Sequence, residues 1–120
     1  MIDTIQTIPD DGGVGIGVRV QEYSGEVVAT LDGAVDVRRL CARAATDPAR
    51  YPLLTGVDEY DDTYFNARQA DRLASELTTL AADHPEQDMI TATARLIALT
   101  KLLQAAPGRP HHRQLIFIGD

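Results

Sequence analysis

A run of four large apolar residues, Leu115-Ile116-Phe117-Ile118, constrains the fold of this chain more than any other feature. It follows the helix-stopping segment Pro107–Pro110 and has the composition of a β-strand. A strand this apolar invites aggregation when its edges stay open, so it should be paired inside a sheet. We therefore expect the strand Leu115–Ile118 to take a central place in the sheet, with the other elements arranged around it.

The N-terminal third predicts a β-hairpin. Across Val14–Tyr23, β-branched residues alternate with small or polar ones, which is the period of a strand with one buried face. Ser24-Gly25 predicts a tight turn, and Glu26–Leu31 predicts the second strand. Asp32-Gly33 is a further turn signal that ends the hairpin. The glycine-rich run 12–17 lacks the helix and the Lys-Ser/Thr pair of a phosphate-binding loop, so a glycine-containing strand is favoured.

Three helices are predicted from apolar residues at helical spacing. Asp36 can cap the first helix, Asn66 is a good N-cap for the second, and Glu86 lies in the first turn of the third. The third helix is apolar over more than one face, so we expect it to lie deepest in the fold. Between the first two helices, the segment Tyr51–Asn66 has no sustained period and is the longest irregular connection that we expect.

This order of elements predicts an α+β fold. We expect a small antiparallel or mixed sheet, formed by the N-terminal hairpin and the C-terminal strand, with about three helices packed on one face. The chain has 120 residues and no internal repeat or low-complexity linker, which favours a single domain over residues 1–120. Residues 1–13 are a candidate flexible segment at its start.

Charge and composition limit the classes of partner. The formal net charge of −7, without a run of Lys or Arg, argues against nucleic acid and suits a basic protein partner, although an acidic surplus also serves solubility. Cys41 is a single cysteine, which excludes an intrachain disulfide. With no signal-peptide pattern in Met1–Pro9 and no apolar run of about 20 residues, we expect a cytoplasmic protein without a membrane partner. The preference for arginine over lysine suggests a GC-rich bacterial gene.

The segment Asp58–Asn66, called the acidic aromatic loop below, is the candidate functional site. It holds four carboxylates and three aromatic residues within nine positions. The acidic residues lack the alternating spacing and the glycine of a calcium loop, and adjacent acids do not make a glycosidase pair. Tyrosines anchor protein interfaces while surrounding charge sets partner choice. We therefore predict a partner-binding surface made of Asp58, Glu59, Tyr60, Asp61, Asp62 and Tyr64.

A structural role for the same loop stays open. In that alternative, Tyr64 and Phe65 pack beneath the loop, and Asp62 or Thr63 forms the turn before the Asn66 cap. The two roles are compatible. Phe65 is the residue we expect to be buried, while Tyr60 and the carboxylates are expected to face water.

The remaining reactive side chains favour structural roles. Cys41 falls on the apolar stripe of its helix, where a thiol acts as a small hydrophobic group. Three histidines lie beside prolines in predicted turns and lack zinc spacing, so we expect them to be solvated: His84, His111 and His112. No catalytic residue, metal ligand or cofactor site is predicted.

A group of arginines has two interpretations. Its members are Arg38, Arg39, Arg43 and Arg50. They can pair with the acidic aromatic loop or solvate one helix face, and the second interpretation is slightly favoured.

The loop also resembles a known set of proteins. The segment Pro52-Leu53-Leu54, the acidic aromatic loop, Gln69 with the Leu73–Leu77 helix, and the ending Phe117-Ile118-Gly119-Asp120 are similar to small uncharacterised bacterial proteins. Those proteins look like single-domain α+β proteins, and some similar small acidic proteins are immunity partners of secreted toxins. The resemblance brings no catalytic motif, and the family usually has glycine where Asp61 stands here.

We therefore predict a non-enzymatic protein-binding protein. The resemblance implies an immunity-type inhibitor that neutralises a cognate bacterial toxin, and the acidic aromatic loop would meet a basic surface on that partner. One alternative is a small metal-dependent or carboxylate-using enzyme. Another is a homo-oligomeric housekeeping protein.

Overall fold

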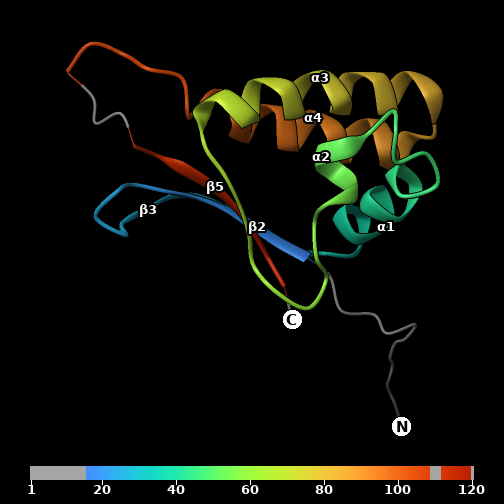
Figure 1. Ribbon diagram of the computed structural model, residues 1–120, viewed down its shortest axis with the longest axis horizontal. Coiled ribbons are helices and arrows are strands. Elements are labelled where there is room, and N and C mark those ends of the chain that lie inside the picture. The colour runs from blue at the N-terminus through green and yellow to red at the C-terminus, as the bar shows by residue number, and fades with distance from the viewer. Residues whose placement is uncertain (1–15, 109–111, 120) are drawn as a thin grey trace, which may run out of the picture.

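The computed structural model describes residues 16–108 and 112–119, and it describes the backbone alone at residues 32–36 (Figure 1). The elements in chain order are β2 Ile16–Gln21, β3 Val27–Ala34, α1 Val35–Ala44, α2 Pro52–Thr55, β4 Thr63–Phe65, α3 Ala67–Asp83, α4 Gln87–Lys101 and β5 Gln114–Ile118. They form an α+β fold in which the helices gather on one side of an antiparallel sheet. The predicted fold class is confirmed. The predicted lead-in 1–13 and the glycines before Ile16 lie outside the described residues.

The sheet has the strand order β3-β2-β5-β4, and every neighbouring pair is antiparallel. The predicted hairpin is β2 with β3, and the C-terminal strand β5 lies between β2 and β4, as its apolar sequence predicted. Leu115 and Phe117 face the helices and are fully buried. Ile116 points to the other face, where its neighbours in register are Arg19 and Tyr64.

The predicted end of the hairpin is wrong. Strand β3 continues through Asp32-Gly33 to Ala34, and α1 begins directly at Val35, one residue before Asp36. The pairing shifts by one residue between the Ile16–Ala34 and Val18–Leu31 pairs. An extra residue at this position is a β-bulge, which explains why turn-forming residues occur inside a strand.

The helices cover the sheet with one apolar core. Helix α4 packs against both α3 and α1, consistent with its apolar sequence. Helix α3 begins with the predicted Asn66 cap, in which the Asn66 side chain and Gln69 exchange hydrogen bonds as a capping box. Fully buried members of the core include Val20, Leu40, Leu54, Leu73, Leu77, Leu80, Met89, Leu96, Leu115 and Phe117.

The connection Tyr51–Asn66 contains two short elements that the sequence did not indicate. Helix α2 starts at Pro52, and the Glu76 carboxylate of α3 accepts hydrogen bonds from the Leu53 and Leu54 amides at 3.0–3.1 Å. Strand β4 pairs with β5, and Phe65 meets Phe117 edge-to-face with ring centres 5.7 Å apart. Together they fix both ends of the acidic aromatic loop.

Candidate functional site

The acidic aromatic loop holds its own backbone in place. The Asp58 amide donates to Thr63 Oγ1 at 3.1 Å, and the Tyr60 amide donates to Asp58 Oδ1 at 2.8 Å. The Asp62 amide donates to Asp61 Oδ1 at 3.0 Å. Such bonds between short polar side chains and nearby amides stabilise turns. Thr63 therefore has its predicted role in the turn, and Asp58 and Asp61 take part as well.

The C-terminal end of the chain packs against this loop. The Gly119 amide donates to Asp62 Oδ1 at 3.0 Å. A Cβ atom added to Gly119 would lie 2.2 Å from the Asp61 amide nitrogen, so only glycine fits at this position. Figure 1 shows the end of β5 running toward this loop. Two segments that carry the resemblance, the loop and the sequence around Gly119, are thus neighbours in space.

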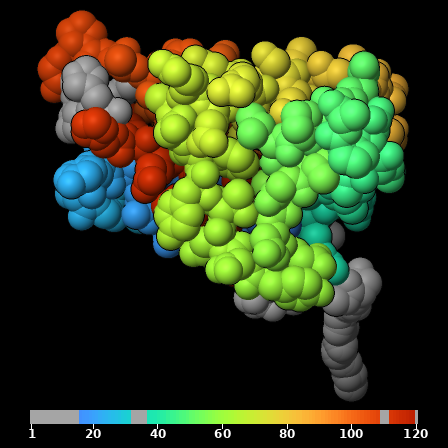
Figure 2. All heavy atoms as spheres, viewed as in Figure 1, coloured from blue at the N-terminus to red at the C-terminus, as the bar shows by residue number. Residues whose placement is uncertain are grey.

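Two tyrosines of the loop point into solvent. Tyr60 is 75% exposed and Tyr64 is 53% exposed, whereas Phe65 is 4% exposed. The predicted exposure of Tyr60 and burial of Phe65 are confirmed, and the alternative in which Tyr64 packs beneath the loop is wrong. Figure 2 shows the yellow-green segment around residue 60 standing forward in the lower part of the view.

The carboxylates of the loop differ in environment. Asp58, Asp61 and Asp62 are exposed, as predicted, whereas Glu59 is half-buried. Glu59 Oε2 accepts a hydrogen bond from Arg38 Nε at 3.2 Å. The Glu59 carboxylate also raises the pKa of the Tyr60 phenol, chiefly through a hydrogen bond and also through its charge.

A groove of about 760 Å³ lies between α1 and residues 55–60. One wall is the α1 face that carries Arg38 and Ala42, continued by Ala45 just after the helix, and Ile16 of β2 also lines the groove. Three of the six predicted site residues line the opposite wall, namely Asp58, Glu59 and Tyr60. The other three predicted site residues, Asp61, Asp62 and Tyr64, lie outside the groove. The predicted surface is therefore divided between a groove and an exposed rim.

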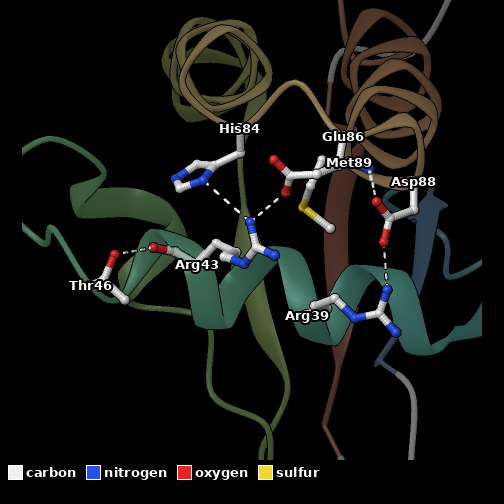
Figure 3. Close-up of polar contacts among 7 residues, drawn as sticks. All are labelled: Arg39, Arg43, Thr46, His84, Glu86, Asp88 and Met89. Carbon is white, nitrogen blue, oxygen red and sulfur yellow. Dashed lines mark hydrogen bonds and ion pairs between the residues drawn. The ribbon is translucent and has the colours of Figure 1, made fainter.

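The arginines of α1 form ion pairs that the sequence analysis did not favour. Arg39 Nη1 lies 2.5 Å from Asp88 Oδ2, and Arg43 Nη1 lies 2.5 Å from Glu86 Oε1 and 3.3 Å from His84 Nδ1 (Figure 3). Arg39 and Arg43 stay partly exposed, as the favoured interpretation predicted, but they pair with acids near the α3–α4 turn. Arg38 pairs with Glu59 of the acidic aromatic loop, as the other interpretation predicted. The acidic residues around the turn between α3 and α4 could have indicated the ion pairs of Arg39 and Arg43. They are more than 40 residues from these two arginines in the sequence, so no local pattern connects the two groups.

A second set of contacts joins the end of α3 to the segment before α2. Arg50 pairs with Asp83 at 2.6 Å, and the buried Tyr51 donates its hydroxyl to the same carboxylate. The Arg50 guanidinium and the Tyr51 hydroxyl lower the pKa of Asp83, while burial is the main reason that the pKa of Tyr51 is raised. These contacts position α2 and hence one end of the loop.

Other reactive side chains have structural surroundings. Cys41 is buried at the groove wall, and burial raises the pKa of its thiol to about 12. His84 is half-buried against Arg43 rather than solvated, whereas the exposed His112 lies beside the Tyr23 ring. His111 lies outside the described residues. Within residues 16–31, 37–108 and 112–119, no three His, Cys, Asp or Glu side chains gather closely enough to hold a metal ion.

Comparison with known proteins gives no relative from which to infer a function. No protein-family model, curated protein or solved structure matches this chain. None of the helices in the described part of the chain is long and apolar enough to cross a membrane.

Proposed function

We propose that the protein is a non-enzymatic binding protein whose acidic aromatic loop contacts a basic surface on a partner protein. The observation that carries this proposal is the exposure of Tyr60 and Tyr64 on a loop whose backbone is held by hydrogen bonds. Tyrosine is enriched among the residues that dominate binding energy. A preorganised loop also loses less conformational entropy when it binds.

The charge of the loop supports a basic partner. Asp58, Asp61 and Asp62 are exposed in the same loop as the two tyrosines, and the whole chain carries a formal net charge of −7. Complementary charge accelerates encounter and rejects partners of like charge, while contributing less to final affinity. The tyrosines are therefore assigned the role of anchors, and the exposed carboxylates the role of steering groups.

The structural contacts of the aspartates decide which substitutions test the proposal well. Asp58, Asp61 and Asp62 accept hydrogen bonds that hold the loop and Gly119, so charge reversal there would change shape as well as charge. Tyr60 and Tyr64 have large exposed side chains. Their replacement by serine removes the anchors and leaves the hydrogen bonds of the loop backbone in place.

The finer proposal is that the partner is a bacterial toxin and this protein its immunity-type inhibitor. Its support is the resemblance of the loop and the Gly-Asp ending to small uncharacterised bacterial proteins, since some similar small acidic proteins are immunity partners of secreted toxins. An inhibitor of this type acts by covering a partner surface and needs no catalytic group.

Co-expression tests the finer proposal. The gene product encoded next to this protein is expressed alone, with the wild type, or with the Tyr60→Ser/Tyr64→Ser variant. We expect growth arrest by the neighbour alone, rescue by the wild type, and loss of rescue with the variant. A neighbour that neither arrests growth nor binds the wild type would remove the toxin interpretation.

A further inference from the structure

The geometry points to a specific ligand for the groove between α1 and residues 55–60, namely an arginine side chain presented by the partner protein. In this proposal the Asp58 carboxylate binds the guanidinium, and the exposed Tyr60 ring stacks against it. The inference rests on the proposed function and names the group that the loop recognises. It assigns the groove a role separate from that of Tyr64 on the outer rim.

The shape of the groove suits a long, thin side chain. One wall presents the small residues Ala42 of α1 and Ala45 just after it, and the opposite wall contains Gly56 and Val57. Ala42, Ala45 and Gly56 are exposed, so an incoming side chain meets little obstruction. The aliphatic stem of an arginine would cover this apolar surface while its charged end stays near the mouth, as long basic side chains commonly do.

The charges along the groove place a cation at Asp58. Two arginines and two carboxylates belong to the lining, but Glu59 pairs with Arg38, and Arg39 pairs with Asp88. Asp58 makes no ion pair with any residue that the structure describes. Its Oδ1 accepts the Tyr60 amide at 2.8 Å, which fixes the direction of the carboxylate. A fixed carboxylate is a preorganised acceptor for a guanidinium.

Arginine fits these surroundings better than lysine or an anion. A planar guanidinium can stack on an aromatic ring and donate to a carboxylate at the same time, whereas an ammonium is a compact and strongly hydrated charge. The lining arginines Arg38 and Arg39 face the carboxylates of Glu59 and Asp88, whereas no described cation offsets the Asp58 carboxylate, which attracts a cation and repels an anion. The tyrosine next to the aspartate therefore favours arginine.

A titration with model compounds tests the groove without the partner. The probe is N-acetyl-arginine amide, followed by backbone amide NMR of the wild-type protein. The control is N-acetyl-citrulline amide, a neutral analogue of the same shape, at matched ionic strength. We expect saturable chemical-shift changes at the amides of Ala42, Ala45, Asp58 and Tyr60, with a Kd for the arginine probe on the order of millimolar. The citrulline probe should bind at least about fivefold more weakly.

A matched pair of variants locates the binding group. Asp58→Asn removes the charge and keeps an oxygen acceptor for the Tyr60 amide. This variant should bind the arginine probe at least about fivefold more weakly than the wild type. Asp71→Asn makes the same charge change at an exposed position of α3 and should leave the Kd unchanged. Unaltered resonances away from the loop would show that both variants stay folded.

Several results would overturn the inference. These are equal affinity for arginine and citrulline probes, no saturation up to about 50 mM, or shifts confined to other surfaces. A partner that depends on Tyr60 and Tyr64 while the probe fails would leave the proposed function standing and reject the groove. Saturable probe binding together with a partner indifferent to both tyrosines would reject the proposed function and leave the groove intact.

Discussion

At the scale of single residues, Gly119 shows how closely the acidic aromatic loop is tied to the fold. The Asp61 backbone occupies the space that any larger side chain at position 119 would need. The loop is therefore a packed surface as well as an exposed one. This contact joins residues that are 58 positions apart, so no local pattern in the sequence predicts it.

Gly119→Ala should destabilise the protein. The added methyl group would lie 2.2–2.5 Å from Asp61 backbone atoms, and overpacking of this kind costs about 1–3 kcal/mol of unfolding free energy. Urea denaturation measures the loss. Gly56→Ala is the control, because its Cβ would lie 3.4 Å from the nearest atom, and we expect a change within about 0.5 kcal/mol. Equal losses in the two variants would contradict the packing assigned to Gly119.

Cys41 should react slowly in the native protein. Burial raises its pKa to about 12, so very little thiolate exists at pH 8. We expect labelling by a thiolate-directed reagent to be more than about a hundredfold slower in buffer than in denaturing urea. Similar rates in both conditions would mean that the groove exposes the thiol to solvent.

At the scale of elements, ion pairs connect α1 and the following segment to the two ends of the α3–α4 turn. Arg39 and Arg43 contact Asp88 and Glu86, and Arg50 contacts Asp83. The groove wall on α1 is thereby held against the helical layer. These pairs are partly exposed, so salt should weaken them.

The stability of the protein should fall at acidic pH. Pairing with Arg50 and Arg39 lowers the pKa values of Asp83 and Asp88 below the ordinary 3.8. A carboxylate with a lowered folded pKa stabilises the protein above its unfolded pKa, and this contribution disappears as pH falls through the folded value. The loss should therefore occur below about pH 4.

Asp83→Asn isolates this effect. The variant should have a lower urea midpoint than the wild type at pH 7, and the difference should shrink as pH falls from 4 toward 2. Asp71→Asn, at an exposed position without an ion pair to the described residues, should show little difference at any pH. A gap between Asp83→Asn and wild type that stays constant with pH would argue against the pairing with Arg50.

The elements differ in how far the sequence predicts them. The alternation in β2, the Asn66 cap of α3 and the apolar runs of α4 and β5 are local signals, and the structure bears them out. Helix α2 and strand β4 are too short for a period to show, and they depend on Glu76 and β5 from distant segments. Asp32-Gly33 was misleading because a bulge and a turn favour the same residues.

In the candidate site, too, the features set by local sequence were predictable and those set by distant segments were not. The exposure of Tyr60 and the burial of Phe65 follow from side-chain chemistry and position before a helix cap. The groove was not predictable, because it exists only where α1 packs beside residues 55–60. For Tyr64 the sequence left both the surface and the space beneath the loop open, because its exposure depends on the register of β4 against β5.

At the scale of the whole molecule, the loop and the tip of the β2–β3 hairpin lie at opposite ends of the sheet. Thr63 pairs with Phe117 near one end of β5, whereas Gln21 pairs with Gln114 at the other. Tyr23, at the hairpin tip, is 84% exposed. The protein thus carries an internal control, since an exposed tyrosine lies far from the proposed binding surface.

The central claim is that Tyr60 and Tyr64 anchor a partner protein. The most direct test is the Kd of the partner, isolated with immobilised wild-type protein, for the wild type, Tyr60→Ser/Tyr64→Ser and Tyr23→Ser. Loss of two anchors should weaken binding by about 100-fold or more, while Tyr23→Ser should bind like the wild type. A folded Tyr60→Ser/Tyr64→Ser variant with wild-type affinity would contradict the claim.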